Sequence, residues 1–129
     1  MIQKSGVFLS IPMLAILALL SSCQFTPTLN QLPINFDKAE VHTLLFSAGN
    51  YQSEERSYYD ALLNLQNKYP DKLNSIKIIQ KKNSDIVQYF NISTYPTLII
   101  MNGKEVEVRV EGHKDSEHIT QTIEPVYKQ

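Results

Sequence analysis

The chain of 129 residues has one cysteine, Cys23, and no tryptophan. A single cysteine cannot form an internal disulfide, so no covalent cross-link within the chain stabilises the fold. Neither sign of charge dominates, because the formal net charge is −1, and this balance argues against a nucleic-acid-binding surface. Apolar residues are plentiful, at 43% of the chain. That proportion suffices for the core of one ordinary domain.

The first 22 residues have the organisation of a secretory signal peptide. Lys4 provides a positive start, residues 7–20 form an apolar run, and two serines precede Cys23. This order predicts a signal peptide over residues 1–22. A transmembrane helix is the alternative. The run is shorter than the roughly 20 apolar residues that a span needs, and Pro12 weakens a continuous helix.

Residues 20–23, Leu-Ser-Ser-Cys, resemble the lipobox of bacterial lipoproteins, in which an aliphatic and two small residues precede a cysteine. The resemblance implies that Cys23 is the lipidation site and that the chain is cut before it. Its thiol would receive a diacylglyceryl group with acyl chains such as palmitate, and no cofactor is expected apart from this covalent lipid. Two acyl chains anchor a protein stably where one does not. The alternative is an ordinary signal peptidase, which leaves a free thiol.

We expect residues 23–35 to hold the lipidated cysteine and a tether, and residues 36–129 to form the domain. The stretch 24–33, QFTPTLNQLP, is polar, contains two prolines and lacks an apolar period, which is typical of a linker. Cleavage would also remove the positive charge of Lys4. The lipid, and not attraction to anionic headgroups, is therefore expected to hold the protein on the membrane.

Hydrophobic periodicity predicts alternating strands and helices in the rest of the chain. Strands are expected at 41–47, 75–80, 97–101 and 104–110, with a short edge strand at 32–36. Helices are expected at 53–69, after a cap at Ser84-Asp85, and after a cap at Asp115 or Ser116. The first helix should end at Pro70. A strand–helix–strand unit followed by a hairpin and a closing helix gives a mixed sheet with helices on both faces.

The last two strands are expected to form a hairpin around Asn102-Gly103, the favoured two-residue turn. Valine alternates with polar residues along the second of these strands. Alternation places the valines on one face and the polar residues on a solvated face. The valines are Val106, Val108 and Val110, and the polar residues are Glu105, Glu107 and Arg109.

Residues 89–100, YFNISTYPTLII, resemble the thioredoxin segment that leads into the cis-proline and its strand. Residues 102–104, Asn-Gly-Lys, and 111–112, Glu-Gly, continue the resemblance, which covers about 41–127. The chain is thus similar to thioredoxin-like proteins. The resemblance implies an α/β thioredoxin-like mixed sheet, built as β-α-β followed by a hairpin and a C-terminal helix.

The redox motif of thioredoxins is missing from this chain. By spacing, the Cys-x-x-Cys motif falls on residues 51–54, which are Tyr-Gln-Ser-Glu. Thiol–disulfide exchange needs an attacking thiolate and a second thiol to resolve the mixed disulfide. Cys23 cannot replace either thiol, because in a lipobox its sulfur would be alkylated by the lipid. We therefore expect a redox-inactive domain that is not an enzyme.

The substrate groove of the family could persist without its cysteines. The resemblance places Tyr51, Thr94, Tyr95 and Pro96 around it, and the backbone before the cis-proline would pair with an extended peptide. The alternative is that Tyr95 only packs and Pro96 is a relic of the fold, since a fold does not imply a function.

Other residues that could carry chemistry have simpler structural explanations. The chain has three histidines, His42, His113 and His118. Their spacing does not fit a zinc site, so no metal is expected. The carboxylates Glu54, Glu55 and Asp60 lie at or near an exposed helix start, where acids interact favourably with the dipole.

The sequence thus predicts a bacterial surface lipoprotein, anchored by Cys23 on the outer face of the cytoplasmic membrane of a Gram-positive cell. Its domain is expected to be a non-catalytic binding or scaffold module whose partner is an envelope protein, a peptide or cell-wall material. The alternative is an accessory or chaperone-like partner of an extracytoplasmic thiol–disulfide or cytochrome-maturation system. Neither nucleic acid nor metal is expected as a partner.

Overall fold

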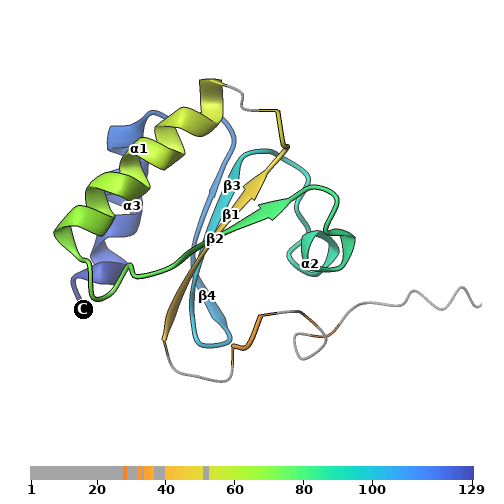
Figure 1. Cartoon of the computed structure of the whole chain (residues 1–129), viewed down its shortest axis with the longest axis horizontal. Helices are drawn as coiled ribbons and strands as arrows, with labels where there is room; N and C mark the ends of the chain where they lie inside the picture. The colour runs from red at the N-terminus through yellow and green to blue at the C-terminus, as the bar shows by residue number, and fades with distance from the viewer. Residues whose placement is uncertain (1–27, 29–31, 33, 37–39, 51–52) are drawn as a thin grey trace, which may run out of the picture.

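One mixed β-sheet organises the structure (Figure 1). The computed structural model describes residues 28, 32, 34–36, 40–50 and 53–129. Within them the strands are β1 (Val41–Ser47), β2 (Ile76–Gln80), β3 (Thr97–Asn102) and β4 (Glu105–Glu111). Their order across the sheet is β2-β1-β3-β4. β1 is parallel to β2 and antiparallel to β3, which is antiparallel to β4, so the predicted mixed sheet and hairpin are confirmed.

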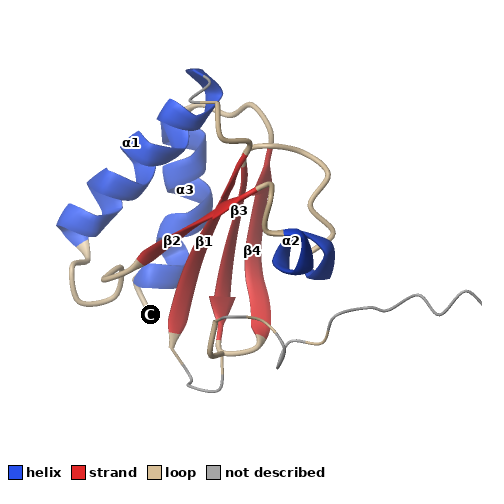
Figure 2. Ribbon diagram, turned by 45° about the vertical axis from the view of Figure 1, so that its right-hand side comes forward, coloured by secondary structure: helices blue, strands red, loops and turns tan. Residues whose placement is uncertain are grey.

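Helices cover both faces of the sheet, as predicted. α1 (Ser53–Lys68) and α3 (Ser116–Tyr127) lie on one face, and α2 (Ser84–Tyr89) lies on the other (Figure 2). α1 ends two residues before Pro70, which cannot continue a helix. Within the described residues, none of the helices is both long and apolar enough to cross a membrane.

The predicted caps are half right. Asp115 caps α3, because its carboxylate accepts the backbone N–H of His118 at 2.7 Å. The prediction for α2 is wrong: Ser84 and Asp85 lie inside the helix, and the capping position belongs to Asn83, whose side chain makes no capping hydrogen bond.

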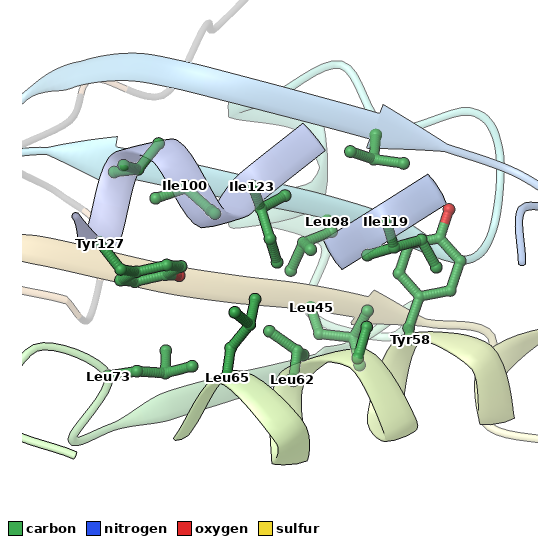
Figure 3. Close-up of a cluster of buried hydrophobic side chains, with 13 residues drawn as sticks. Leu45, Tyr58, Leu62, Leu65, Leu73, Leu98, Ile100, Ile119, Ile123 and Tyr127 are labelled. Atoms are coloured by element: carbon green, nitrogen blue, oxygen red, sulfur yellow. The ribbon is translucent and has the colours of Figure 1, made fainter. Parts of the chain in front are cut away.

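The larger core lies between the sheet and the pair α1 and α3 (Figure 3). Tyr58 and Tyr127 are its two largest fully buried side chains. The Tyr58 hydroxyl donates to the Gly112 carbonyl at 2.6 Å, and the hydroxyls of Thr43 and Tyr127 are hydrogen-bonded at 2.7 Å. Each buried phenol therefore has a partner, which removes most of the cost of burying it.

A second core lies between the sheet and α2, and it includes residues that precede β1. Leu32, Ile34 and Phe36 are buried there, and the Phe36 ring lies 5.0 Å from the ring of His42. None of the described residues between 32 and 36 is in a strand, so the predicted edge strand is wrong. The alternating apolar pattern instead marks a segment that packs on a sheet face without joining the ladder.

The hairpin turn lies one residue beyond its predicted position. Asn102 pairs with Glu105, so the central residues of the turn are Gly103 and Lys104, and the predicted Asn102-Gly103 turn is wrong. Gly103 has a φ of 57°, a backbone conformation that glycine adopts without steric cost.

A β-bulge in β4 breaks the predicted valine face. Ile100 pairs with Val108, whereas its neighbour Met101 pairs with Val106, so Glu107 is the extra residue. Residues directly opposite each other share a face of a sheet. Val106 therefore lies on the Met101 face and is 48% exposed, apart from the other two valines of the strand.

Candidate functional site

The loop before β3 lies at the end of the sheet where β1 and β2 also end. Because β1 and β2 are parallel to each other and β1 is antiparallel to β3, the last residues of β1 and β2 and the first residues of β3 lie at the same end of the sheet. We call this end, where the strands stop, the binding edge. Grooves outside the carboxyl ends of strands are frequent ligand sites in α/β sheets. In this loop the Tyr95–Pro96 peptide bond is cis, which confirms the cis-proline that the resemblance implied.

Two hydrogen bonds fix this loop against the end of the hairpin. The buried Pro96 accepts the Gly112 N–H through its carbonyl at 2.8 Å, and the Thr97 hydroxyl donates to the Thr94 carbonyl at 2.6 Å. Gly112 has a φ of 75°, and a Cβ there would lie 3.4 Å from Cγ2 of Thr94. Glycine thus allows both the backbone conformation and the close approach of the two segments.

Tyr95 presents an unpaired section of backbone. Neither its N–H nor its C=O is hydrogen-bonded to another residue that the structure describes. Its half-buried ring lies 5.7 Å from the Lys81 ammonium group, and burial raises the pKa of its hydroxyl. An open donor–acceptor pair in extended backbone can pair with an added strand.

Three of the residues predicted from the sequence thus come together at this edge: Thr94 is exposed, Tyr95 is half-buried and Pro96 is buried. Tyr51, the fourth predicted groove residue, and Cys23, the predicted lipidation site, lie outside the described residues.

Glu55 fixes the connection between β1 and α1, and its placement among exposed acids was wrong. Its side chain is 3% exposed. The Oε1 atom accepts the Ser47 hydroxyl at 2.8 Å and the Ala48 N–H at 3.2 Å. The carboxylate therefore ties the first turn of the helix to the end of β1, which borders the loop of Tyr95.

Two hollows open at this end of the sheet, one on each face. The hollow on the α1 face, of about 370 Å³, is lined by Glu55, Tyr59 and Ile78 among others. The hollow on the α2 face, of about 340 Å³, includes Lys81 and Tyr95 in its lining. The first contains a buried carboxylate and the second an ammonium group, so the two differ in charge.

Arg109 is a structural residue that the sequence analysis missed. It was expected on a solvated strand face, but its guanidinium donates to the Phe90 carbonyl at 2.7 Å and to the Asn91 carbonyl at 3.1 Å. Asn91 has a φ of 52°. Arg109 therefore caps the carbonyls of the turn that follows α2. No sequence signal reveals this, because the contact depends on how β4 sits beside α2.

The histidines and acids do not gather into a metal site in the part of the chain that the structure describes. No three His, Cys, Asp or Glu side chains there are close enough to hold an ion. His42 is buried, and its Nε2 atom has no hydrogen-bond partner among the described residues. It packs edge-on against Phe36, as a core residue does.

The sheet order, the helices on both faces and the cis-proline loop define a thioredoxin-like domain. The sequence profile of the thioredoxin family matches residues 57–125. This chain belongs to the thioredoxin family.

A relative from Bacillus subtilis (strain 168), described as a Pal-related lipoprotein, is 36% identical over 103 residues, covering 78% of this chain and 80% of that protein. Two solved structures share the fold. The thioredoxin of Trypanosoma brucei brucei has a TM-score of 0.58 at 16% identity, over 79% of this chain and 88% of that one. Thioredoxin O2 of Arabidopsis thaliana, in the oxidised state, has a TM-score of 0.55 at 22% identity, over 72% and 84%.

The domain has the thioredoxin fold without thioredoxin's thiols. The sequence has one cysteine, at position 23, and residues 24–129 have none. Disulfide exchange within one chain requires two thiols. Position 54, the second cysteine position by spacing, is a glutamate in the first turn of α1, and a carboxylate cannot form a mixed disulfide.

Proposed function

We propose that this protein is a lipid-anchored lipoprotein of the bacterial envelope and that its thioredoxin-like domain is a non-catalytic binding module. Two observations support the anchor: the lipobox-like residues 20–23, and a relative with the printed name of lipoprotein. Cys23 would carry the diacylglyceryl lipid, and the following residues would hold the domain on the extracytoplasmic face of the cytoplasmic membrane. A Gram-positive envelope, with its single membrane, suits such a short tether.

The open backbone of Tyr95 carries the binding proposal. In the described part of the chain its N–H and C=O have no partner. The loop is held by the hydrogen bond from the Gly112 N–H to the Pro96 carbonyl and by the bond from the Thr97 hydroxyl to the Thr94 carbonyl. A preformed, unpaired backbone segment can accept an extended peptide by strand addition, with main-chain hydrogen bonds giving affinity and neighbouring hollows giving specificity. The ligand we propose is an extended segment of an envelope protein.

The anchor is tested by metabolic labelling with palmitate. Cys23→Ala should abolish labelling, because this is the only thiol in the chain. Ser22→Ala is the matched control, since alanine is also small, and it should be labelled like the wild type. Labelling that persists in Cys23→Ala would overturn the anchor.

The binding site is tested by photo-crosslinking in intact cells. A crosslinking amino acid at position 95 should capture a discrete envelope protein. The same group at Leu63, a 56% exposed residue of α1, should not, because Leu63 is not among the residues that line either hollow. If both positions capture the same set of proteins, the loop is not the binding site.

The absence of catalysis is tested with insulin. The full-length chain should not accelerate the reduction of insulin disulfides by dithiothreitol, because no thiol pair is present to relay the exchange. A thioredoxin assayed in parallel serves as the positive control. Acceleration by this chain above the uncatalysed rate would refute the non-catalytic assignment.

A further inference from the structure

We propose that the hollow on the α2 face binds an acidic side chain of the extended peptide that pairs with Tyr95. This inference rests on the proposed function and adds the chemistry of the ligand to it. The hollow is about 340 Å³ and is bordered by Tyr95 itself, so a side chain of the paired peptide needs no further loop movement to reach it.

Unused hydrogen-bonding groups converge on this hollow. Four of its lining residues are exposed and have hydroxyl or amide side chains, and none of these four side chains is hydrogen-bonded to another described residue. They are Ser84, Gln88, Asn91 and Ser93. Hydroxyl and amide groups can donate to a carboxylate, and hydrogen bonds to a charged acceptor are stronger than those between neutral groups.

The charge of the hollow favours an anion. Lys81 lines it, and among the residues that the structure describes no aspartate or glutamate does. Asp85, the one acid of α2, lines a separate hollow together with Lys82. The guanidinium of Arg109 is bonded to the carbonyl of Asn91, a lining residue, and adds positive potential, although Glu111 pairs with it.

The other face would reject the same side chain. There the neighbouring hollow contains the buried carboxylate of Glu55, and like charges repel. Alternate residues of an extended peptide point to opposite faces, so one peptide position would face Lys81 and its neighbours would face away. The geometry therefore predicts a preference for Asp or Glu at a single position and tolerance beside it.

Lys81 and Lys82 form a matched pair for the test, because they are adjacent, exposed and equally charged, and only Lys81 lines the hollow. Full-length protein in detergent micelles is presented with a library of random hexapeptides, acetylated and amidated to remove terminal charges. The strongest binder is then measured by fluorescence anisotropy against wild type, Lys81→Gln and Lys82→Gln. Amide exchange at Thr94, Tyr95 and Thr97 reports whether the peptide occupies the loop, since Pro96 has no N–H.

We expect the bound peptides to be enriched in Asp or Glu at one position. Lys81→Gln should weaken the best binder about fivefold, near the upper end for an exposed ion pair. Replacing the peptide's acid by its amide should weaken it similarly, and Lys82→Gln should change affinity less than about twofold. Raising the salt concentration should narrow the gap between acid and amide peptides.

Two failures are distinguishable. Peptides that protect the loop amides without an acid preference, or that lose equal affinity in both lysine variants, overturn the proposed pocket for an acidic side chain and leave the peptide-binding function standing. If no hexapeptide protects the loop amides, strand addition at Tyr95 is wrong, and the pocket proposal fails with it.

Discussion

At the scale of single residues, one carboxylate oxygen fixes the strand end beside the proposed binding loop. Oε1 of Glu55 holds the Ser47 hydroxyl and the Ala48 N–H, and the Ser47 carbonyl in turn accepts the Lys81 N–H at 3.1 Å. The same short chain of contacts therefore links the start of α1 to Lys81, which lines the pocket proposed for an acidic side chain. A change at Glu55 should affect both stability and the position of Lys81.

We predict that Glu55→Ala lowers the free energy of unfolding by about 2 kcal/mol, because it leaves a buried hydroxyl and a backbone N–H without their acceptor. Glu54→Ala is the control, since Glu54 shares the first turn and is only partly buried. It should cost less than about 1 kcal/mol, the contribution of a charge near a helix end. Urea unfolding followed by circular dichroism measures both. Equal losses would show that the Glu55 hydrogen bonds contribute nothing beyond helix-end charge.

The same pair shows what could not be predicted from the sequence at this scale. Glu54 and Glu55 are adjacent, identical and equally placed for the helix dipole, so no local rule separates them. Burial separates them, and burial depends on how α1 packs on the sheet. The cis Tyr95–Pro96 bond could be predicted, because a local sequence pattern resembles the family.

At the scale of elements, Arg109 joins the edge strand β4 to the turn after α2. A six-residue helix has little stability of its own, because nucleation is costly. α2 depends on packing and on partners for its last carbonyls. Arg109 donates to the carbonyls of Phe90 and Asn91, and Asn91 lines the pocket proposed for an acidic side chain.

We predict that Arg109→Gln loosens α2 more than it loosens the sheet. Amide exchange should accelerate at Phe90 and Ile92, whose N–H groups bond to Ile86 and Val87, by about tenfold, as expected for the loss of roughly 1.4 kcal/mol. Exchange in β1 should change little, because β3 separates it from β4.

Arg56→Gln on the exposed side of α1 is the control for general loss of positive charge and should leave these amides unchanged. Equal acceleration in β1 and α2 would mean that Arg109 stabilises the domain as a whole and not the turn.

Most elements could be predicted from periodicity alone, and the misses share one cause. The prediction for α1 was accurate within one residue, because its apolar spacing is long and Pro70 terminates it. Leu32, Ile34 and Phe36 alternate like a strand, yet they pack on a face of the sheet. Alternation records which side chains are buried and does not record whether the backbone finds a hydrogen-bonding partner. The bulge at Glu107 has the same origin, since register is a property of two strands.

At the scale of the whole molecule, the proposed function assigns two tasks to two parts of the sequence. The proposed anchor is at residue 23, and the proposed binding edge lies where β1 and β2 end and β3 begins. The two largest fully buried side chains, Tyr58 and Tyr127, lie between α1, α3 and the sheet. Tyr58 is hydrogen-bonded to Gly112 beside the loop, and Tyr127 is hydrogen-bonded to Thr43 in the centre of β1. Global stability and the shape of the binding edge are therefore coupled through the Tyr58–Gly112 bond.

These two tyrosines also predict how stability depends on alkaline pH. Burial raises the pKa of Tyr58 to about 12, with the nearby charge of Glu111 adding to the effect, and burial raises the pKa of Tyr127 to about 12 against the opposing hydrogen bond from Thr43. In the unfolded chain both hydroxyls have a pKa of about 10. A raised pKa means that folding favours the neutral phenol, so this stability is fully present below about pH 10 and is lost as the pH rises toward 12.

We therefore predict that the free energy of unfolding falls by up to about 2 kcal/mol per buried tyrosine between about pH 10 and 12. Urea unfolding at successive pH values measures it. Tyr127→Phe should lose stability at pH 7, because Thr43 is left without its partner, yet its stability should fall less steeply above pH 10 than that of the wild type. Tyr89→Phe, in α2 and outside the larger core, should keep the wild-type slope. If Tyr127→Phe also kept that slope, the buried Tyr127 phenol would not be a group that makes stability fall at alkaline pH.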